Sequence, residues 1–144
     1  METTLSSQEN HRYLREKAGY FFLDDLCLIS AEGSDLFSYL QTQTTNDVNE
    51  LKPGQGQNNA IVDRKARVIS TFSLHRTGEE SAVILVETQQ KENLLEHLNS
   101  FLFREDVTLT LSNHFVLALQ GPKSQEIIKN FIINFQSHHK IIYK

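Results

Sequence analysis

Two segments of this sequence of 144 residues, 68–75 and 107–111, show the alternating pattern of an extended strand. Successive side chains of an extended strand point to opposite sides, so such a run gathers its apolar residues on one face. In residues 68–75, one face carries Val68, Ser70, Phe72 and Leu74. In residues 107–111, three apolar residues alternate with two threonines. The pattern predicts an antiparallel sheet built from hairpins.

The other strands are predicted from β-branched and aromatic runs that are bounded by turn residues. We expect strands at residues 20–23, 26–29, 57–62, 66–75, 82–87, 107–111 and 114–119, with a last one beginning at 140–143. Residues 63–65 form the tip of the hairpin between 57–62 and 66–75. Residues 114–119 are expected to pair with 107–111 across a two-residue turn.

Amphipathic spacing predicts three helices between these strands. The first is short and begins after Ser34, which we expect to be its N-cap. Leucines and phenylalanines recur at helical spacing over residues 89–103, and a third helix begins at Pro122 and continues to Phe135. Strands that cluster in hairpins, with helices between them, indicate an α+β fold. We expect a largely antiparallel sheet with amphipathic helices packed on one face.

The ordered domain is predicted to span residues 19–144. Residues 1–18 show no hydrophobic period over their first dozen positions, and we expect a flexible N-terminal arm or a short, weakly held helix there. We find no linker, internal repeat or low-complexity segment. A chain of this length can bury a core without a metal or a disulfide.

Charge and cysteine content exclude several classes of protein. The net charge is −4, which disfavours nucleic-acid binding, so we expect no direct DNA contact. Residues 1–11 lack the features of a signal peptide, and no apolar run approaches the length that spans a bilayer. The only cysteine is Cys27, in a strand where we expect an inert, buried thiol. A reducing, cytoplasmic location without membrane attachment is predicted.

The histidines, the polar cluster at residues 44–47 and the hairpin tip are the candidates for local chemistry. The six histidines are scattered, so no metal site is expected. The polar cluster 44–47 is interpreted as a helix cap, because Thr, Asn and Asp accept hydrogen bonds from free N–H groups at helix starts. The hairpin tip 63–67 holds three basic residues, which are either simply solvated or form a local anion site. Amides on the arm before this tip suit recognition of a heterocycle edge.

Three motifs together resemble one family. Residues 31–48 (AEGSDLFSYLQTQTTNDV) resemble the opening G-x-D-A-x-x-F-L-Q-x-x-x-T-N-D-V of the folate-binding superfamily that contains YgfZ and the aminomethyltransferase GcvT. Residues 51–56 (LKPGQG) with 64–69 (RKARVI) resemble its L-x-P-G and K-G-R-V elements, and 119–122 (LQGP) resemble its L-Q-G-P segment. The resemblance implies the N-terminal folate-binding fold of this superfamily.

Within the superfamily, the chain is more similar to YgfZ. The transferases carry an Asp-Asp pair where this sequence has Ser70 and Thr71. The resemblance therefore implies no catalytic residue and no enzymatic activity of the chain's own. Ala66 replaces the family's hairpin glycine, from which we expect a turn without a positive φ at that position.

Family members are about twice as long as this chain, and the YgfZ signature K-G-C-Y-x-G-Q-E lies in the part that has no counterpart here. The resemblance implies that the C-terminal part of the family is absent, either in a fragment or in a short gene. We expect the chain to be a monomer, or a weak dimer that associates through the surface that this part would cover.

The leading hypothesis is a tetrahydrofolate-binding, YgfZ-like accessory protein that assists the maturation or repair of iron–sulfur client proteins. The cofactor is predicted to bind at four residues: Asn46, Asn58, Ser70 and Phe72. Phe72 would stack on a ring of the cofactor or lie in the core, and the other three would donate or accept hydrogen bonds. A folate-dependent aminomethyltransferase and a ligand-free protein interaction module are the alternatives.

Overall fold

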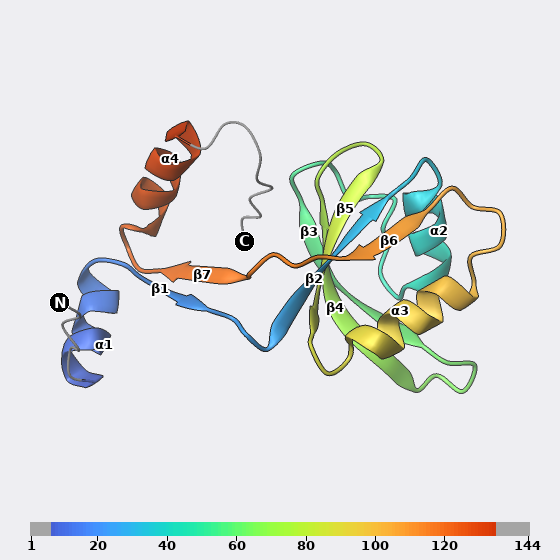
Figure 1. Ribbon diagram of the computed structural model, residues 1–144, viewed down its shortest axis with the longest axis horizontal. Coiled ribbons are helices and arrows are strands. Elements are labelled where there is room, and N and C mark those ends of the chain that lie inside the picture. The colour runs from blue at the N-terminus through green and yellow to red at the C-terminus, as the bar shows by residue number, and fades with distance from the viewer. Residues whose placement is uncertain (1–6, 135–144) are drawn as a thin grey trace. The chain divides into compact units, whose positions relative to one another are not determined.

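The computed structural model describes residues 7–134, which divide into two compact units. One unit comprises residues 24–116, and the other combines residues 7–23 with 117–134. Figure 1 shows the elements of both units along the chain. The candidate site residues all belong to the first unit.

The first unit contains a five-stranded sheet and two helices. Its elements are β2 (Leu26–Glu32), α2 (Leu36–Gln43), β3 (Gly56–Val62), β4 (Val68–Arg76), β5 (Ser81–Glu87), α3 (Lys91–Ser100) and β6 (Thr108–Leu111). The strands lie in the order β3-β4-β5-β2-β6, and every neighbouring pair is antiparallel. The prediction of an α+β fold with a sheet of hairpins is confirmed.

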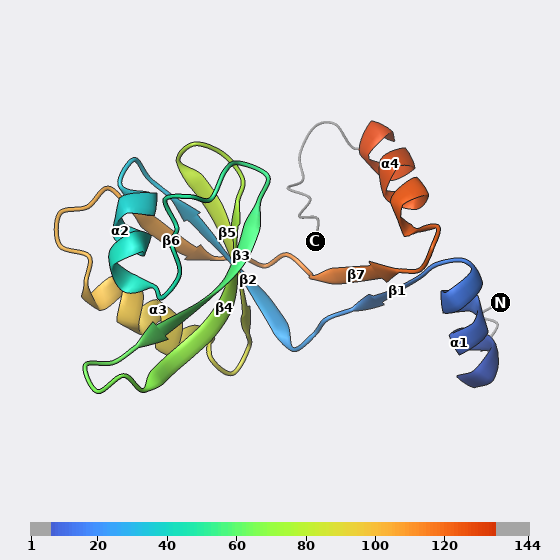
Figure 2. The ribbon, with the colours of Figure 1, turned by 180° about the vertical axis from the view of Figure 1, so that it is seen from behind.

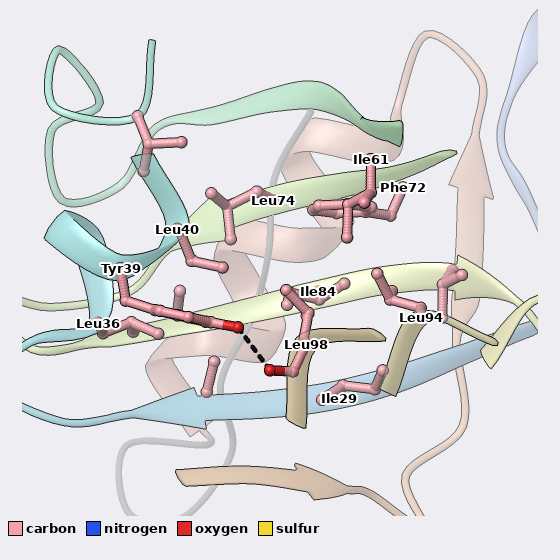
Figure 3. Close-up of a cluster of buried hydrophobic side chains, with 14 of the residues drawn as sticks. Ile29, Leu36, Tyr39, Leu40, Ile61, Phe72, Leu74, Ile84, Leu94 and Leu98 are labelled. Atoms are coloured by element: carbon pink, nitrogen blue, oxygen red, sulfur yellow. Dashed lines mark hydrogen bonds between the residues drawn. The ribbon is translucent and has the colours of Figure 1, made fainter. Parts of the chain in front are cut away.

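Helices α2 and α3 both cover the same face of this sheet (Figures 1 and 2). The helices contribute Leu36, Tyr39, Leu40, Leu94 and Leu98 to the core, and the strands contribute Ile29, Ile61, Phe72, Leu74 and Ile84. Figure 3 shows these side chains together and the hydrogen bond from the Tyr39 hydroxyl to the Leu98 carbonyl, which joins the two helices. Burial raises the pKa of Tyr39 to about 12, since the anion loses its hydration there. We call this side of the sheet the covered face.

The second unit consists of α1 (Ser7–Glu16), β1 (Gly19–Phe22), β7 (Leu117–Gln120) and α4 (Ser124–Asn134). β1 and β7 form a two-stranded antiparallel ribbon, in which Tyr20 lies opposite Leu119 and Phe22 opposite Leu117. Three of these side chains are half exposed or more: Tyr20, Phe22 and Leu117. The expected strand at 140–143 and the end of the last helix lie outside the described residues.

The expected hairpin between 107–111 and 114–119 is wrong. β6 pairs with β2, where Leu111 lies opposite Ile29 and Leu109 opposite Ala31. This pairing extends the apolar core face, whereas residues 112–113 contain no glycine to form the tight turn of a two-residue hairpin. The chain instead continues to β7, which pairs with β1.

The N-cap assigned to Ser34 is also wrong. Asp35 occupies the N-cap position of α2, and its side chain makes no capping bond. Ser34 donates through its backbone N–H and its hydroxyl to Asp106 Oδ2, at 3.2 and 2.9 Å, and the Asp106 N–H donates to Asp35 Oδ2 at 2.8 Å. The two bonds from Ser34, first that of its backbone N–H, lower the pKa of Asp106. All three bonds tie the start of α2 to the loop before β6. Within residues 7–134, no helix is long and apolar enough to cross a membrane.

Candidate functional site

The polar segment after α2 runs along the outer edge of β3. The Thr45 N–H donates to the Ala60 carbonyl at 3.1 Å, and the Ala60 N–H donates back to Thr45 Oγ1 at 3.3 Å. The Asn46 side-chain amide donates to the Asn58 carbonyl. Thr45 and Asn46 therefore cover a sheet edge. The helix-cap interpretation is wrong, because no helix begins directly after residue 47. This arrangement places Asn46 against Asn58.

Gln41 holds this segment in place, and the sequence interpretation did not identify its role. Its side-chain oxygen accepts hydrogen bonds from the backbone N–H groups of Val48 and Asn49, at 2.6 and 3.3 Å. Asp47 Oδ1 also accepts from the Asn49 N–H, at 3.0 Å, as in an Asx turn. The Val48 side chain enters the core as a result. A glutamine seven residues before a buried valine is too common a pattern to predict the hydrogen bond between Gln41 and Val48.

Asn58 lies on the face of the sheet opposite the helices. Its side-chain oxygen accepts a 2.8 Å hydrogen bond from Ser73, its cross-strand neighbour on β4. Thr71 and His75 share this face with them, because alternate residues of β4 point the same way. Asn58 and Thr71 are exposed, Ser73 is half-buried and His75 is buried. We call the four residues Asn58, Thr71, Ser73 and His75 the polar face.

Gly56 is required by the packing of His75. The two residues are cross-strand partners, and a Cβ added to Gly56 would lie 2.3 Å from His75 Nδ1. The imidazole thus occupies the space above the glycine. The role of the preceding Gly54 is different, since its φ of +87° supports the turn that leads into β3. The glycines of residues 54–56 are therefore explained by a turn and by close packing.

Ser70 and Phe72 lie on the covered face. The Ser70 side chain is 1% exposed and donates a 3.0 Å hydrogen bond to Gln90 Oε1. Phe72 is 5% exposed and packs in the core among the side chains of Figure 3. The structure therefore brings Asn46 and Asn58 together and places Ser70 and Phe72 on the other side of the sheet. The predicted contact of these four residues with a cofactor stays a prediction.

Thr71 is the member of the Ser70–Thr71 pair that faces away from the core. Its backbone N–H donates to Gln90 Oε1 at 3.0 Å. Because side chains alternate along β4, the Thr71 side chain and its hydroxyl lie on the polar face. A carboxylate at this position would lie beside Ser73, two residues along the strand. The uncharged pair leaves the polar face with neutral donors and acceptors and without a general base other than His75.

The hairpin tip is held by Asp63. Its carboxylate accepts hydrogen bonds from the backbone N–H groups of Lys65 and Arg67 and forms an ion pair with the Arg67 guanidinium at 2.8 Å. These bonds, first those from Arg67, lower the pKa of Asp63. One of the three basic side chains is thus neutralised locally, which weakens the anion-site alternative and leaves Arg64 and Lys65 exposed.

Ala66 adopts a left-handed conformation, with φ of +59°. The expectation that its turn needs no positive φ is wrong. The Ala66 N–H donates to the Asp63 carbonyl and the Asp63 N–H to the Arg67 carbonyl, which leaves residue 66 at the position that hairpins of this length give to glycine. An alanine there carries strain from its Cβ.

Cys27 is partly buried in β2, and its thiol contacts the Val86 carbonyl at 3.5 Å. Burial raises the pKa of Cys27, an effect opposed in part by Lys91 and by a hydrogen bond from Thr88. A raised pKa keeps the thiol protonated, which agrees with an unreactive cysteine. Among residues 7–134, no three His, Cys, Asp or Glu side chains gather closely enough to hold a metal ion.

The fold and this geometry define a domain in which helices cover one face of an antiparallel sheet and amide and hydroxyl groups line the other. The model of the GCVT N-terminal domain family matches residues 2–142, so the chain belongs to this family. The resemblance to the YgfZ and aminomethyltransferase superfamily is confirmed.

Two curated relatives and one solved structure are similar to the chain. The aminomethyltransferases of Bacillus cytotoxicus and of a Bacillus cereus strain are each 28% identical over 128 residues, which cover 88% of this chain and 35% of theirs. The glycine cleavage system aminomethyltransferase T of Bartonella henselae shares the fold, with a TM-score of 0.76 at 22% identity over 85% of this chain and 34% of that one. The chain spans about a third of the length of these relatives.

Proposed function

We propose that this chain binds tetrahydrofolate, and that the cofactor contacts the polar face beside Asn46. Membership of the GCVT N-terminal domain family supports this proposal. The observation that carries it is the row formed by Asn58, Ser73 and Thr71, which presents amide and hydroxyl groups on one face of the sheet. Thr71 stands at one of the two positions where the family's transferases have an acid.

Asn58 is the residue that we expect to bind the heterocycle. Its side-chain oxygen accepts from Ser73, so its NH₂ group can donate to a ring nitrogen or carbonyl oxygen of the cofactor. Asn46 fixes the backbone at Asn58 through its own amide. In this arrangement Ser70 and Phe72 act from the covered face, where they hold β4 in register.

Calorimetry with tetrahydrofolate tests the proposal. We expect Asn58→Ala to weaken binding by about tenfold, the effect of about one hydrogen bond. Asn93→Ala removes an exposed asparagine from α3 and is the matched control, which should bind as the unmodified chain does. Absence of heat with the unmodified chain, or equal affinity in Asn58→Ala, would contradict the proposal.

Within this function, we infer an accessory role of YgfZ type in the maturation or repair of iron–sulfur proteins. Its support is the uncharged Ser70–Thr71 pair, which leaves no carboxylate to assist one-carbon transfer. We expect an iron–sulfur enzyme to lose activity in cells that lack this gene. The unmodified gene should restore the activity, and a gene encoding Asn58→Ala should not. Full restoration by the variant would separate this role from folate binding.

Folate-dependent aminomethyl transfer is the second candidate, and the curated relatives favour it because they are aminomethyltransferases. It predicts that tetrahydrofolate and a lipoyl-bound aminomethyl donor give methylenetetrahydrofolate, with release of ammonia and the dihydrolipoyl carrier. The accessory role predicts no product. A product formed by the unmodified chain, and lost in Asn58→Ala, would establish the transferase candidate instead.

A further inference from the structure

The two edge strands of the five-stranded sheet differ in what lies beside them. The outer edge of β3 is occupied by residues 45 and 46, which bond to Ala60 and Asn58. β6 is hydrogen-bonded to β2 on one side, and on its other side no strand of residues 7–134 pairs with it. Its sequence, Thr-Leu-Thr-Leu, contains no charge or proline, the residues that commonly protect an exposed edge.

The hydrogen bonding of β2 identifies the backbone groups that face outward. The Ser112 N–H, directly after β6, donates to the Leu28 carbonyl at 2.8 Å. Because antiparallel strands bond to a neighbour at every second residue, Thr110 and Thr108 direct their N–H and C=O groups toward β2. Leu109 and Leu111 therefore direct theirs to the open edge, ready to pair with another strand.

We propose that β6 pairs with β6 of a second copy of this chain, antiparallel and centred on Thr110. Leu109 of each copy then lies opposite Leu111 of the other, and their outward groups form four hydrogen bonds across a two-fold axis. Both threonine side chains meet on one face and the leucines on the other, so the alternation is self-complementary. Leu111, which is 41% exposed, becomes covered.

The charges that flank β6 agree with this register. Asp106 lies four residues before Thr110 and His114 four residues after it. Continued beyond β6, this register brings Asp106 of one copy, whose carboxylate also accepts from Ser34, to the end where His114 of the other copy lies. The two five-stranded sheets would thereby join into one sheet with their covered faces on the same side.

Molecular mass measured by light scattering over a concentration series tests the pairing. The full chain is expected to approach twice 16.6 kDa as its concentration rises. Thr110→Lys places two lysines directly opposite each other at the centre of the pair, with Cβ atoms about 5 Å apart, and should raise the dimer dissociation constant at least tenfold. Thr108→Lys is the matched control: the same change on the same strand separates the charges by about 14 Å and leaves dimerisation nearly unchanged.

Cross-linking gives a second readout that does not depend on a stable dimer. In a Cys27→Ala background, Thr110→Cys should form a disulfide-linked dimer on oxidation, because opposite Cα atoms in a non-hydrogen-bonded pair are about 4.5 Å apart. Thr108→Cys should cross-link at least tenfold more slowly. A monomer at all concentrations with equal cross-linking of both variants would overturn the proposal. So would a dimer that persists in Thr110→Lys and is lost in Leu117→Lys, since the ribbon of β1 and β7 would then be the interface.

Discussion

Neighbouring side chains of β4 face two different environments, and the contrast explains how one strand can serve both stability and binding. Ser70, Phe72 and Leu74 are buried under α2 and α3, whereas Thr71 and Ser73 lie on the polar face with Asn58. The covered face excludes water and holds the strand, so the polar face can keep donors and acceptors exposed at fixed spacing. Substitutions on the two faces should therefore have separable effects.

The largest expected effect comes from Phe72→Ala on the covered face. Removing a buried phenylalanine side chain costs about 3–5 kcal/mol in free energy of unfolding, which urea denaturation measures. Ser73→Ala, the adjacent change on the polar face, should cost less than about 1 kcal/mol, the worth of its bond to Asn58. Similar losses in the free energy of unfolding for Phe72→Ala and Ser73→Ala would contradict the distinction between the two faces.

Tyr39→Phe tests the link between the two helices above the covered face. The variant loses the hydroxyl that bonds to the Leu98 carbonyl and should be less stable by about 1–2 kcal/mol. The pKa of Tyr39 is raised to about 12, above its ordinary value, so the folded state favours the protonated form. Its contribution is complete below about pH 10 and is lost as the pH rises toward 12. The difference in stability between the two proteins should shrink over that range; a constant difference would contradict the assignment.

Asn59, like Ser70, is a buried polar residue of the covered face. Its side chain is 4% exposed, and its Nδ2 group has no hydrogen-bond partner. Asn59→Val should raise the free energy of unfolding by about 1 kcal/mol, because it removes a buried donor that is not satisfied. The measurement is urea denaturation, with affinity for tetrahydrofolate as the companion readout. Loss of stability in this variant would show that the amide stabilises the covered face.

The smallest expected change concerns the hairpin that carries both faces. Ala66→Gly relieves the strain of a left-handed alanine and should stabilise the chain by about 0.5–1 kcal/mol, net of the greater entropy of glycine when unfolded. Thermal melting measures this gain. Arg64→Gly, two positions earlier in the turn, is the control and should destabilise the chain. Stabilisation by both glycines would point to an effect unrelated to φ.

Local periodicity was enough to predict the β3–β4 hairpin and helix α3, because both are specified by residues close in sequence. The partner of β6 was not predictable in this way. β6 and β2 are distant along the chain, and only the structure shows that Leu109 and Leu111 lie opposite the buried Ala31 and Ile29. The role of Asn46 was missed for the same reason, since its amide serves a strand twelve residues away.

Part of the candidate site could be predicted from the sequence. The alternation along β4 already places Ser70 and Phe72 on the side of Leu74 and separates them from Thr71 and Ser73. The chemical types of Asn58, Ser70 and Phe72 do not by themselves reveal that these residues lie on different faces of the sheet. The structure adds the contact of Asn46 with Asn58, which no periodicity could provide.

Nuclear magnetic resonance of the side-chain amides tests directly whether tetrahydrofolate binds at the polar face, because Asn58 and Asn59 are adjacent and face opposite sides of β3. During titration with tetrahydrofolate, we expect the NH₂ resonances of Asn58 to shift strongly and to saturate. Those of Asn59, buried on the covered face, should move little. A strong shift of Asn59 with none at Asn58 would contradict binding at the polar face.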